Sequence, residues 1–165
     1  MTITGRGSPQ TGPVAPLAGW GPYNVTWTVN DYRNWGAPPE KILLGVPWYG
    51  YRWPAGSPAP GAATLGAGTA RTFAEAMPDA EADGPLWDAA SSTPWTRRQE
   101  TDWRQPWFDD SRSLGLKYDM VMEEGLGGVG IWALGYDGSR PELWAALEQA
   151  FGTSAAPVPP PPGGF

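Results

Sequence analysis

Two short apolar runs constrain the fold of this chain most. Residues 41–50 contain the continuous apolar run ILL followed by Val46, and residues 128–134 read GVGIWAL. Each run is too short for a buried helix and is typical of a strand that is covered on both faces. Helical patterns lie before, between and after the two runs, which predicts parallel strands joined by helical crossovers. Because two parallel strands alone are not a stable sheet, we expect the chain to form part of a larger α/β structure.

Three segments have the periodicity of helices. The apolar residues that recur at helical spacing are Val25, Val29 and Tyr32 within residues 23–35, Leu114, Tyr118 and Val121 within the second segment, and Leu143, Leu147 and Phe151 within the third. Ser111 or Ser113 can cap the second helix, which we expect to end at Gly125. Ser139 and Glu142 have the spacing of a capping box ahead of the third helix.

The same patterns divide the chain into five segments. The predicted segments are a loop over 1–22, a helix and a strand over 23–53, an insertion over 54–110, a helix, strand and helix over 111–151, and a Pro-rich linker over 152–165. Within the insertion we expect one short helix near RTFAEAM and short strands near Trp87, Trp95 and Trp103. The composition of the last segment is typical of a linker that leads to another domain.

Composition excludes several kinds of chemistry. The chain has no cysteine and no histidine, which removes disulfides, the usual zinc sites and any catalytic Ser-His or Cys-His pair. A net charge of −6 without a basic run predicts neither a nucleic-acid partner nor a membrane partner. We therefore expect no metal and no cofactor. The 11 Trp and 6 Tyr residues exceed what a small core needs and favour a sugar-binding surface, because flat amphipathic rings suit the apolar faces of sugars.

Three stretches together resemble the C-terminal part of family 18 glycoside hydrolases, the chitinase-like family, and especially its bacterial branch of spore-cortex and cell-wall enzymes. They are PEKILLGVPWYGYRW, PWFDDSRSLGLKYDMVMEEGLGGVGIWALGYDG and RPELWAAL, and the resemblance runs in order over about residues 5–151. It implies the C-terminal part of a (β/α)8 TIM barrel, about the last two to three strand–helix units, with a small α+β insertion. Residues 41–50 would be the seventh strand, 54–110 the insertion and 128–134 the eighth strand.

The resemblance also implies an activity, together with a departure from it. The family cleaves β-1,4-linked N-acetylglucosamine polymers with retention by substrate assistance, using an acid from an Asp-x-x-Asp-x-Asp-x-Glu motif. That motif does not occur in these 165 residues, and MTIT stands nearest to the family's Met-x-Tyr-Asp, with Ile3 and Thr4 at its two functional positions. We expect the acidic clusters Asp109–Asp110, Asp119 with Glu123–Glu124, and Asp79–Glu81–Asp83 to be solvated faces or caps. No catalytic residue is therefore predicted, and whether the chain is an enzyme stays open.

The outgoing ends of the two predicted strands do match the family. Trp132 stands where the family has the tryptophan that forms the floor under the bound sugar, so the resemblance implies a platform at this position. Tyr49, Trp53 and Tyr136 are the further substrate-binding candidates, since active sites of such barrels lie at the C-terminal ends of the strands. Tyr51 takes the place where the family often has arginine, and Arg52 follows it.

Three functions stay open on the sequence. The first is a fragment of a glycoside hydrolase that acts on chitin or a cell-wall glycan, inactive by itself, with further domains before Met1 and after Phe165. The second is a non-catalytic carbohydrate-binding or cell-wall-attaching module, and the third is a Trp- and Pro-rich interaction protein that binds no sugar. The first two imply a polysaccharide partner that contains N-acetylglucosamine and a location outside the cell or at the cell wall. Neither chitin nor peptidoglycan is favoured, and no oligomeric state is predicted.

Overall fold

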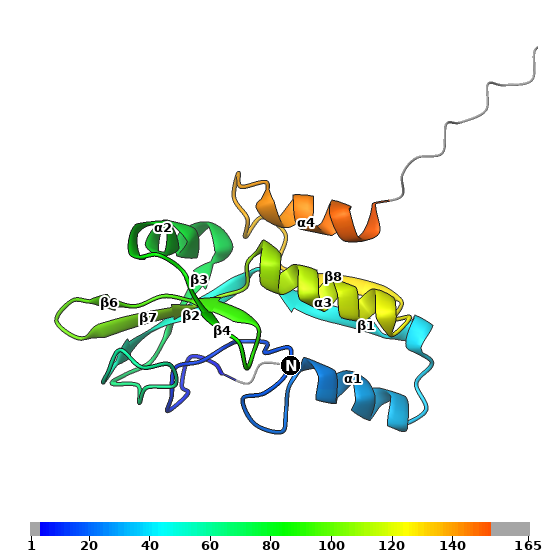
Figure 1. Ribbon diagram of the computed structural model, residues 1–165, viewed down its shortest axis with the longest axis horizontal. Coiled ribbons are helices and arrows are strands. Elements are labelled where there is room, and N and C mark those ends of the chain that lie inside the picture. The colour runs from blue at the N-terminus through cyan, green and yellow to red at the C-terminus, as the bar shows by residue number, and fades with distance from the viewer. Residues whose placement is uncertain (1–3, 153–165) are drawn as a thin grey trace, which may run out of the picture.

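The chain forms two separate sheets in the computed structural model, which describes residues 4–152 (Figure 1). The first is a parallel pair, β1 (Leu43–Pro47) and β8 (Gly128–Trp132), in register from Leu43 opposite Gly128 to Pro47 opposite Trp132. The predicted parallel pairing is thus confirmed. Ile3 and the Pro-rich segment from residue 153 onward lie outside the described residues.

Three helices accompany the parallel pair. They are α1 (Val25–Asn34), α3 (Ser111–Glu123) and α4 (Glu142–Phe151), and Figure 1 shows α1 and α4 on opposite sides of the pair, with α3 lying over it. A short 3-10 turn, η1 (Pro39–Lys41), leads into β1. The helices and the pair share one core, whose buried apolar side chains include Val25, Val29, Leu44, Val46, Trp48, Leu114, Tyr118, Val121 and Leu143. The predicted inner faces of the helices are confirmed except at Tyr32, which is exposed.

The caps of two helices differ from the prediction. Asp110, and neither serine, is the N-cap of α3: its carboxylate accepts from the Ser113 backbone N–H (2.8 Å), while the Ser113 hydroxyl accepts from the Asp110 N–H (2.9 Å). A carboxylate at this position also suits the helix dipole. At α4 the N-cap is Pro141, which has no side-chain cap, so the predicted capping box of Ser139 and Glu142 is wrong.

The second sheet is antiparallel and contains the remaining strands. These are β2 (Tyr49–Ala55), β3 (Thr69–Thr72), β4 (Leu86–Asp88), β5 (Thr93–Trp95), β6 (Arg98–Gln99) and β7 (Trp103–Trp107), with α2 (Phe73–Asp83) between β3 and β4. The strand order is β3-β2-β7-β5-β4, with β6 also paired to β7. The short helix and the short strands predicted for the insertion are present.

The insertion begins earlier than predicted. The sequence places residues 49 and 50 in the strand over 41–50 and residues 51–53 in the same segment, yet all five belong to β2, which pairs with both β3 and β7. Gly50 explains part of this, because a Cβ at this position would overlap the carbonyl of Trp107 in β7, so only glycine allows the two strands to approach so closely. Trp48 is therefore the only residue between the end of β1 and the start of β2.

Asp109 is buried and not exposed to solvent. It lies beneath α3, where it forms an ion pair with Lys117 and accepts from the Ser113 hydroxyl (2.7 Å). Both charged side chains are about 1% exposed. The expectation that Asp109 lies on a solvated face or caps a helix is wrong, since the α3 crossover covers it and a buried charge needs a partner.

Candidate functional site

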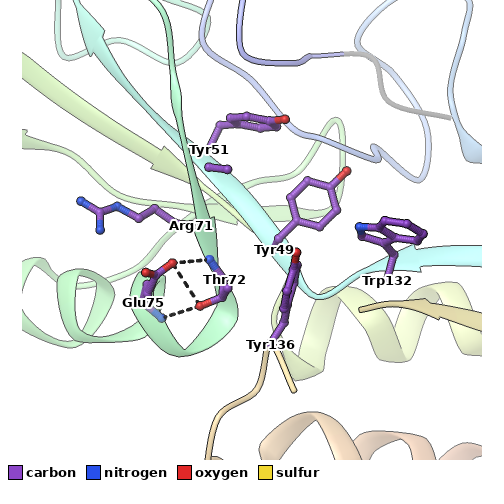
Figure 2. A pocket seen from close by; sticks show the side chains of 8 residues that line it. Tyr49, Tyr51, Arg71, Thr72, Glu75, Trp132 and Tyr136 are labelled. Carbon is purple, nitrogen blue, oxygen red and sulfur yellow. Dashed lines mark hydrogen bonds between the residues drawn. The ribbon is translucent and has the colours of Figure 1, made fainter. Parts of the chain in front are cut away.

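A pocket opens where the parallel pair meets the antiparallel sheet, and Figure 2 shows it. Its cavity of about 230 Å³ is lined by Tyr49, Tyr51, Ala70, Arg71, Thr72, Glu75, Trp132 and Tyr136. The lining comes from the end of β8, the loop after it, the start of β2, the end of β3 and the first turn of α2. The pocket therefore lies at the carboxyl ends of β1 and β8, where the sequence places the functional edge.

Trp132 is the most exposed aromatic side chain of this pocket. It is the last residue of β8, opposite Pro47, and 68% of its surface is exposed. Its carbonyl accepts a hydrogen bond from the Trp48 backbone N–H (2.8 Å), and the peptide bond to Ala133 is cis. A large ring with this much exposed surface is suited to stacking on a ligand.

Three tyrosines extend the aromatic surface from Trp132. The ring centroids of Tyr49 and Tyr51 are 6.0 Å apart and those of Tyr49 and Tyr136 are 6.4 Å apart, both in edge-to-face arrangements. Figure 2 shows the rings of Tyr51, Tyr49 and Tyr136 arranged in a row beside the indole. Each contributes a hydroxyl that can donate and accept hydrogen bonds. The sequence does not predict Tyr51 as a site residue, because the resemblance places an arginine at this position.

The charged residues of the pocket, Arg71 and Glu75, lie on the side away from Trp132 (Figure 2). One carboxylate oxygen of Glu75 accepts from the Thr72 backbone N–H (2.8 Å) and hydroxyl (3.2 Å), which completes the capping box of α2. Figure 2 shows the Arg71 side chain extending away from Trp132, toward the side on which Glu75 lies. The part of the pocket around Trp132 is therefore aromatic and uncharged. It can hold a neutral ligand that has an apolar face and several hydroxyls.

Trp53, which the sequence places among the substrate-binding residues, does not line this pocket. Its side chain is fully buried in a second core with Trp95 and Trp107. Two residues along β2 from Tyr51, it packs its ring against that tyrosine, with centroids 5.4 Å apart. A ring without exposed surface cannot stack on a sugar, so the prediction for Trp53 does not fit this structure. The other three predicted residues, Tyr49, Trp132 and Tyr136, are brought together.

The part of the chain that the structure describes, residues 4–152, holds no group of three or more acidic, His or Cys side chains placed to bind a metal ion. None of its helices is long and apolar enough to cross a membrane. Thr4, at one of the two positions where the family has a functional pair, is buried, and its hydroxyl donates to the Pro13 carbonyl (2.6 Å).

The parallel pair, its helical crossover and a pocket at the carboxyl ends of its strands place this chain among the α/β proteins built like (β/α) barrels. The family model of glycosyl hydrolases family 18 matches residues 1–137. The chain belongs to this family.

Relatives and solved structures agree with the assignment. The chain is 28% identical to di-N-acetylchitobiase of Rattus norvegicus, over 76% of this chain and 42% of that protein. It is 29% identical to the cortical fragment-lytic enzyme of Bacillus subtilis, over 74% of this chain and 28% of that protein. A plant class V chitinase mutant from Cycas revoluta, solved with (GlcNAc)3, superposes with a TM-score of 0.80 at 24% identity, over 91% of this chain and 44% of that one. The chain thus spans less than half the length of the proteins it matches.

Proposed function

We propose that this chain is the C-terminal part of a family 18 glycoside hydrolase and that its aromatic pocket binds β-1,4-linked N-acetylglucosamine polymers, either chitin or a cell-wall glycan. One observation carries the proposal. The exposed indole of Trp132 and the rings of Tyr49 and Tyr136 meet at the carboxyl ends of β1 and β8. Tyr51 joins the set as a fourth aromatic residue.

The chemistry of the pocket supports a sugar ligand. A pyranose ring has an apolar C–H face that stacks on an aromatic ring, and hydroxyls at its edge that bind polar groups. The pocket offers one exposed indole face together with three phenol hydroxyls, and it has room for about one sugar unit. By their names, one of the relatives above acts on di-N-acetylchitobiose and the other on cortical fragments, which fits either substrate class.

Catalysis belongs to the whole protein in this proposal. Substrate-assisted hydrolysis requires a glutamic acid that protonates the leaving oxygen while the acetamido group of the substrate attacks the anomeric carbon. The sequence has no Asp-x-x-Asp-x-Asp-x-Glu pattern that could supply this acid. We propose that the acid lies on strand–helix units outside the present sequence and that these units pack beside β1, at the strand edge opposite β8.

Binding and turnover by the 165-residue chain test this proposal. We expect saturable binding of chitotetraose by isothermal titration calorimetry and no release of fluorophore from a fluorogenic chitooligosaccharide. Cellotetraose, which has the same linkage but lacks the acetamido groups, is the control ligand and should bind more weakly. An absence of chitotetraose binding would refute the role of the pocket, whereas clear turnover would refute the assignment of the acid to other units.

The missing acid pattern favours a second candidate, a non-catalytic carbohydrate-binding or cell-wall-attaching module. The two candidates differ in the DNA directly upstream of the Met1 codon. A reading frame that continues into the acid motif supports the hydrolase, whereas a stop codon followed by a ribosome-binding site supports the module. Under either candidate the glycan partner implies a location outside the cell or at the cell wall.

A further inference from the structure

Trp48 connects the two walls of the pocket through its backbone. It is fully buried and stands alone between β1 and β2. Its N–H donates to the Trp132 carbonyl (2.8 Å), and its own carbonyl accepts from the Phe73 N–H at the start of α2 (2.9 Å). The next residue of α2, Ala74, donates its N–H to the Tyr136 carbonyl (3.0 Å). One residue thus links the end of β8, the first turn of α2 and, through it, the loop that carries Tyr136.

The indole of Trp48 reaches the same loop by a second route. It packs edge-to-face on Trp144 of α4, with ring centroids 4.9 Å apart. The Trp144 Nε1–H donates to a carboxylate oxygen of Asp137 (2.9 Å), which is buried and directly follows Tyr136. The position of Tyr136 therefore depends on Trp48 through both its backbone and its ring.

Buried polar groups lie in the same part of the core as this indole. One oxygen of Asp109 pairs with Lys117, while its other oxygen, the Tyr118 hydroxyl and Trp48 Nε1 have no hydrogen-bond partner among the described residues. Burial raises the pKa of the Tyr118 hydroxyl, the Trp48 side chain opposes this, and the negative charge of Asp109 raises it further. Trp48 and Tyr118 belong to the same buried core, and Tyr118 directly follows Lys117 on α3. The buried pair of Asp109 and Lys117 resists displacement, because separating the two side chains leaves a buried charge uncompensated.

We propose that Trp48, packed in the core with Tyr118 of α3 and against Trp144 of α4, is a positioning residue that sets Trp132 and Tyr136 relative to each other for sugar binding. This inference rests on the proposed function of the pocket. It assigns a binding role to a side chain that no ligand in the pocket can touch. The affinity of the pocket then depends on a residue in the core as well as on the aromatic rings that line it.

A matched pair of variants separates positioning from core filling. Trp48→Phe removes the indole edge that packs on Trp144, and Trp95→Phe makes the same change in the second core, at a tryptophan that is 5% exposed. Both variants lose buried apolar area and should lose comparable thermal stability. We expect Trp48→Phe to weaken chitotetraose binding by about tenfold, because a site whose supporting residues loosen loses its geometry, and Trp95→Phe to bind like the wild type.

Affinities are measured by calorimetry well below the unfolding midpoint of each variant, so that stability loss does not enter. If Trp48→Phe does not fold, Trp144→Phe replaces it, since it removes the hydrogen bond to Asp137 from a half-exposed ring and should weaken binding by about threefold. Unchanged affinity in whichever of these two variants folds overturns the inference, as does an equal loss in Trp95→Phe. Failure of the wild type to bind refutes the proposed function itself, and the inference with it.

Discussion

Replacing Trp132 by alanine should remove most of the stacking surface of the pocket. The side chain is 68% exposed, which for a tryptophan leaves roughly 170 Å² of accessible surface. A sugar ring that stacks on one face covers about half of this, roughly 80 Å², which corresponds to about 2 kcal/mol at about 25 cal/mol per Å². The dissociation constant for chitotetraose should therefore rise about 30-fold.

The assay is a calorimetric titration of Trp132→Ala beside Trp35→Ala. Trp35 is the matched control because it is 74% exposed and lies at the end of α1, outside the pocket. Both substitutions remove an exposed ring, so each should change the free energy of unfolding by less than about 1 kcal/mol. An unchanged affinity in Trp132→Ala, or the same loss in Trp35→Ala, would refute the reasoning that Trp132 is the platform.

Three further predictions concern stability. Lys117→Met leaves the Asp109 carboxylate buried without its counter-ion and should cost about 3–5 kcal/mol in urea denaturation; a loss below about 1 kcal/mol would contradict a buried pair. Gly50→Ala should cost about 1–3 kcal/mol because its Cβ meets a backbone carbonyl, while Gly45→Ala in β1, where a Cβ meets nothing, is the control. The pKa of Glu100 is lowered, because two neighbouring arginines outweigh the effect of its partial burial. The interaction of Glu100 with these arginines contributes well below about 1 kcal/mol to the free energy of unfolding at this exposure. This contribution is present above the ordinary carboxyl pKa and is lost as the pH falls through the lowered pKa of Glu100. Glu100→Gln should therefore lose less stability on acidification than the wild type; equal acid sensitivity would contradict this.

The parallel pair was predictable because its signals are local. Apolar runs at residues 42–46 and 128–134 are bounded by glycine and by helical periodicity, and burial on both faces demands such a pattern. The position of Trp132 at the end of β8 follows directly from that register. Tyr49 and Tyr136 could be predicted for the same reason, since each lies within a few residues of a strand end.

The remaining errors arise from tertiary contacts that residue type and periodicity do not reveal. Trp53 is aromatic and lies on the same strand as Tyr49 and Tyr51, yet the pairing of β2 with β7 places its side chain in the second core. The fate of Asp109 depends on Lys117 lying beside it, eight residues later on α3. Neither contact follows from the apolar periodicity that identified the helices and strands.

The one-residue junction at Trp48 separates the frame of the pocket from its outer wall. The parallel pair and its helices form the frame, whereas β2, β3 and α2 contribute Tyr49, Tyr51, Thr72 and Glu75 to the wall. The insertion leaves the frame through β2 and returns through β7, and these two strands are paired neighbours. An exchange or lengthening of the insertion between them would therefore leave the frame and Trp132 in place. The wall can therefore be exchanged as one unit, joined to the frame at Trp48 on one side and at the start of α3 on the other.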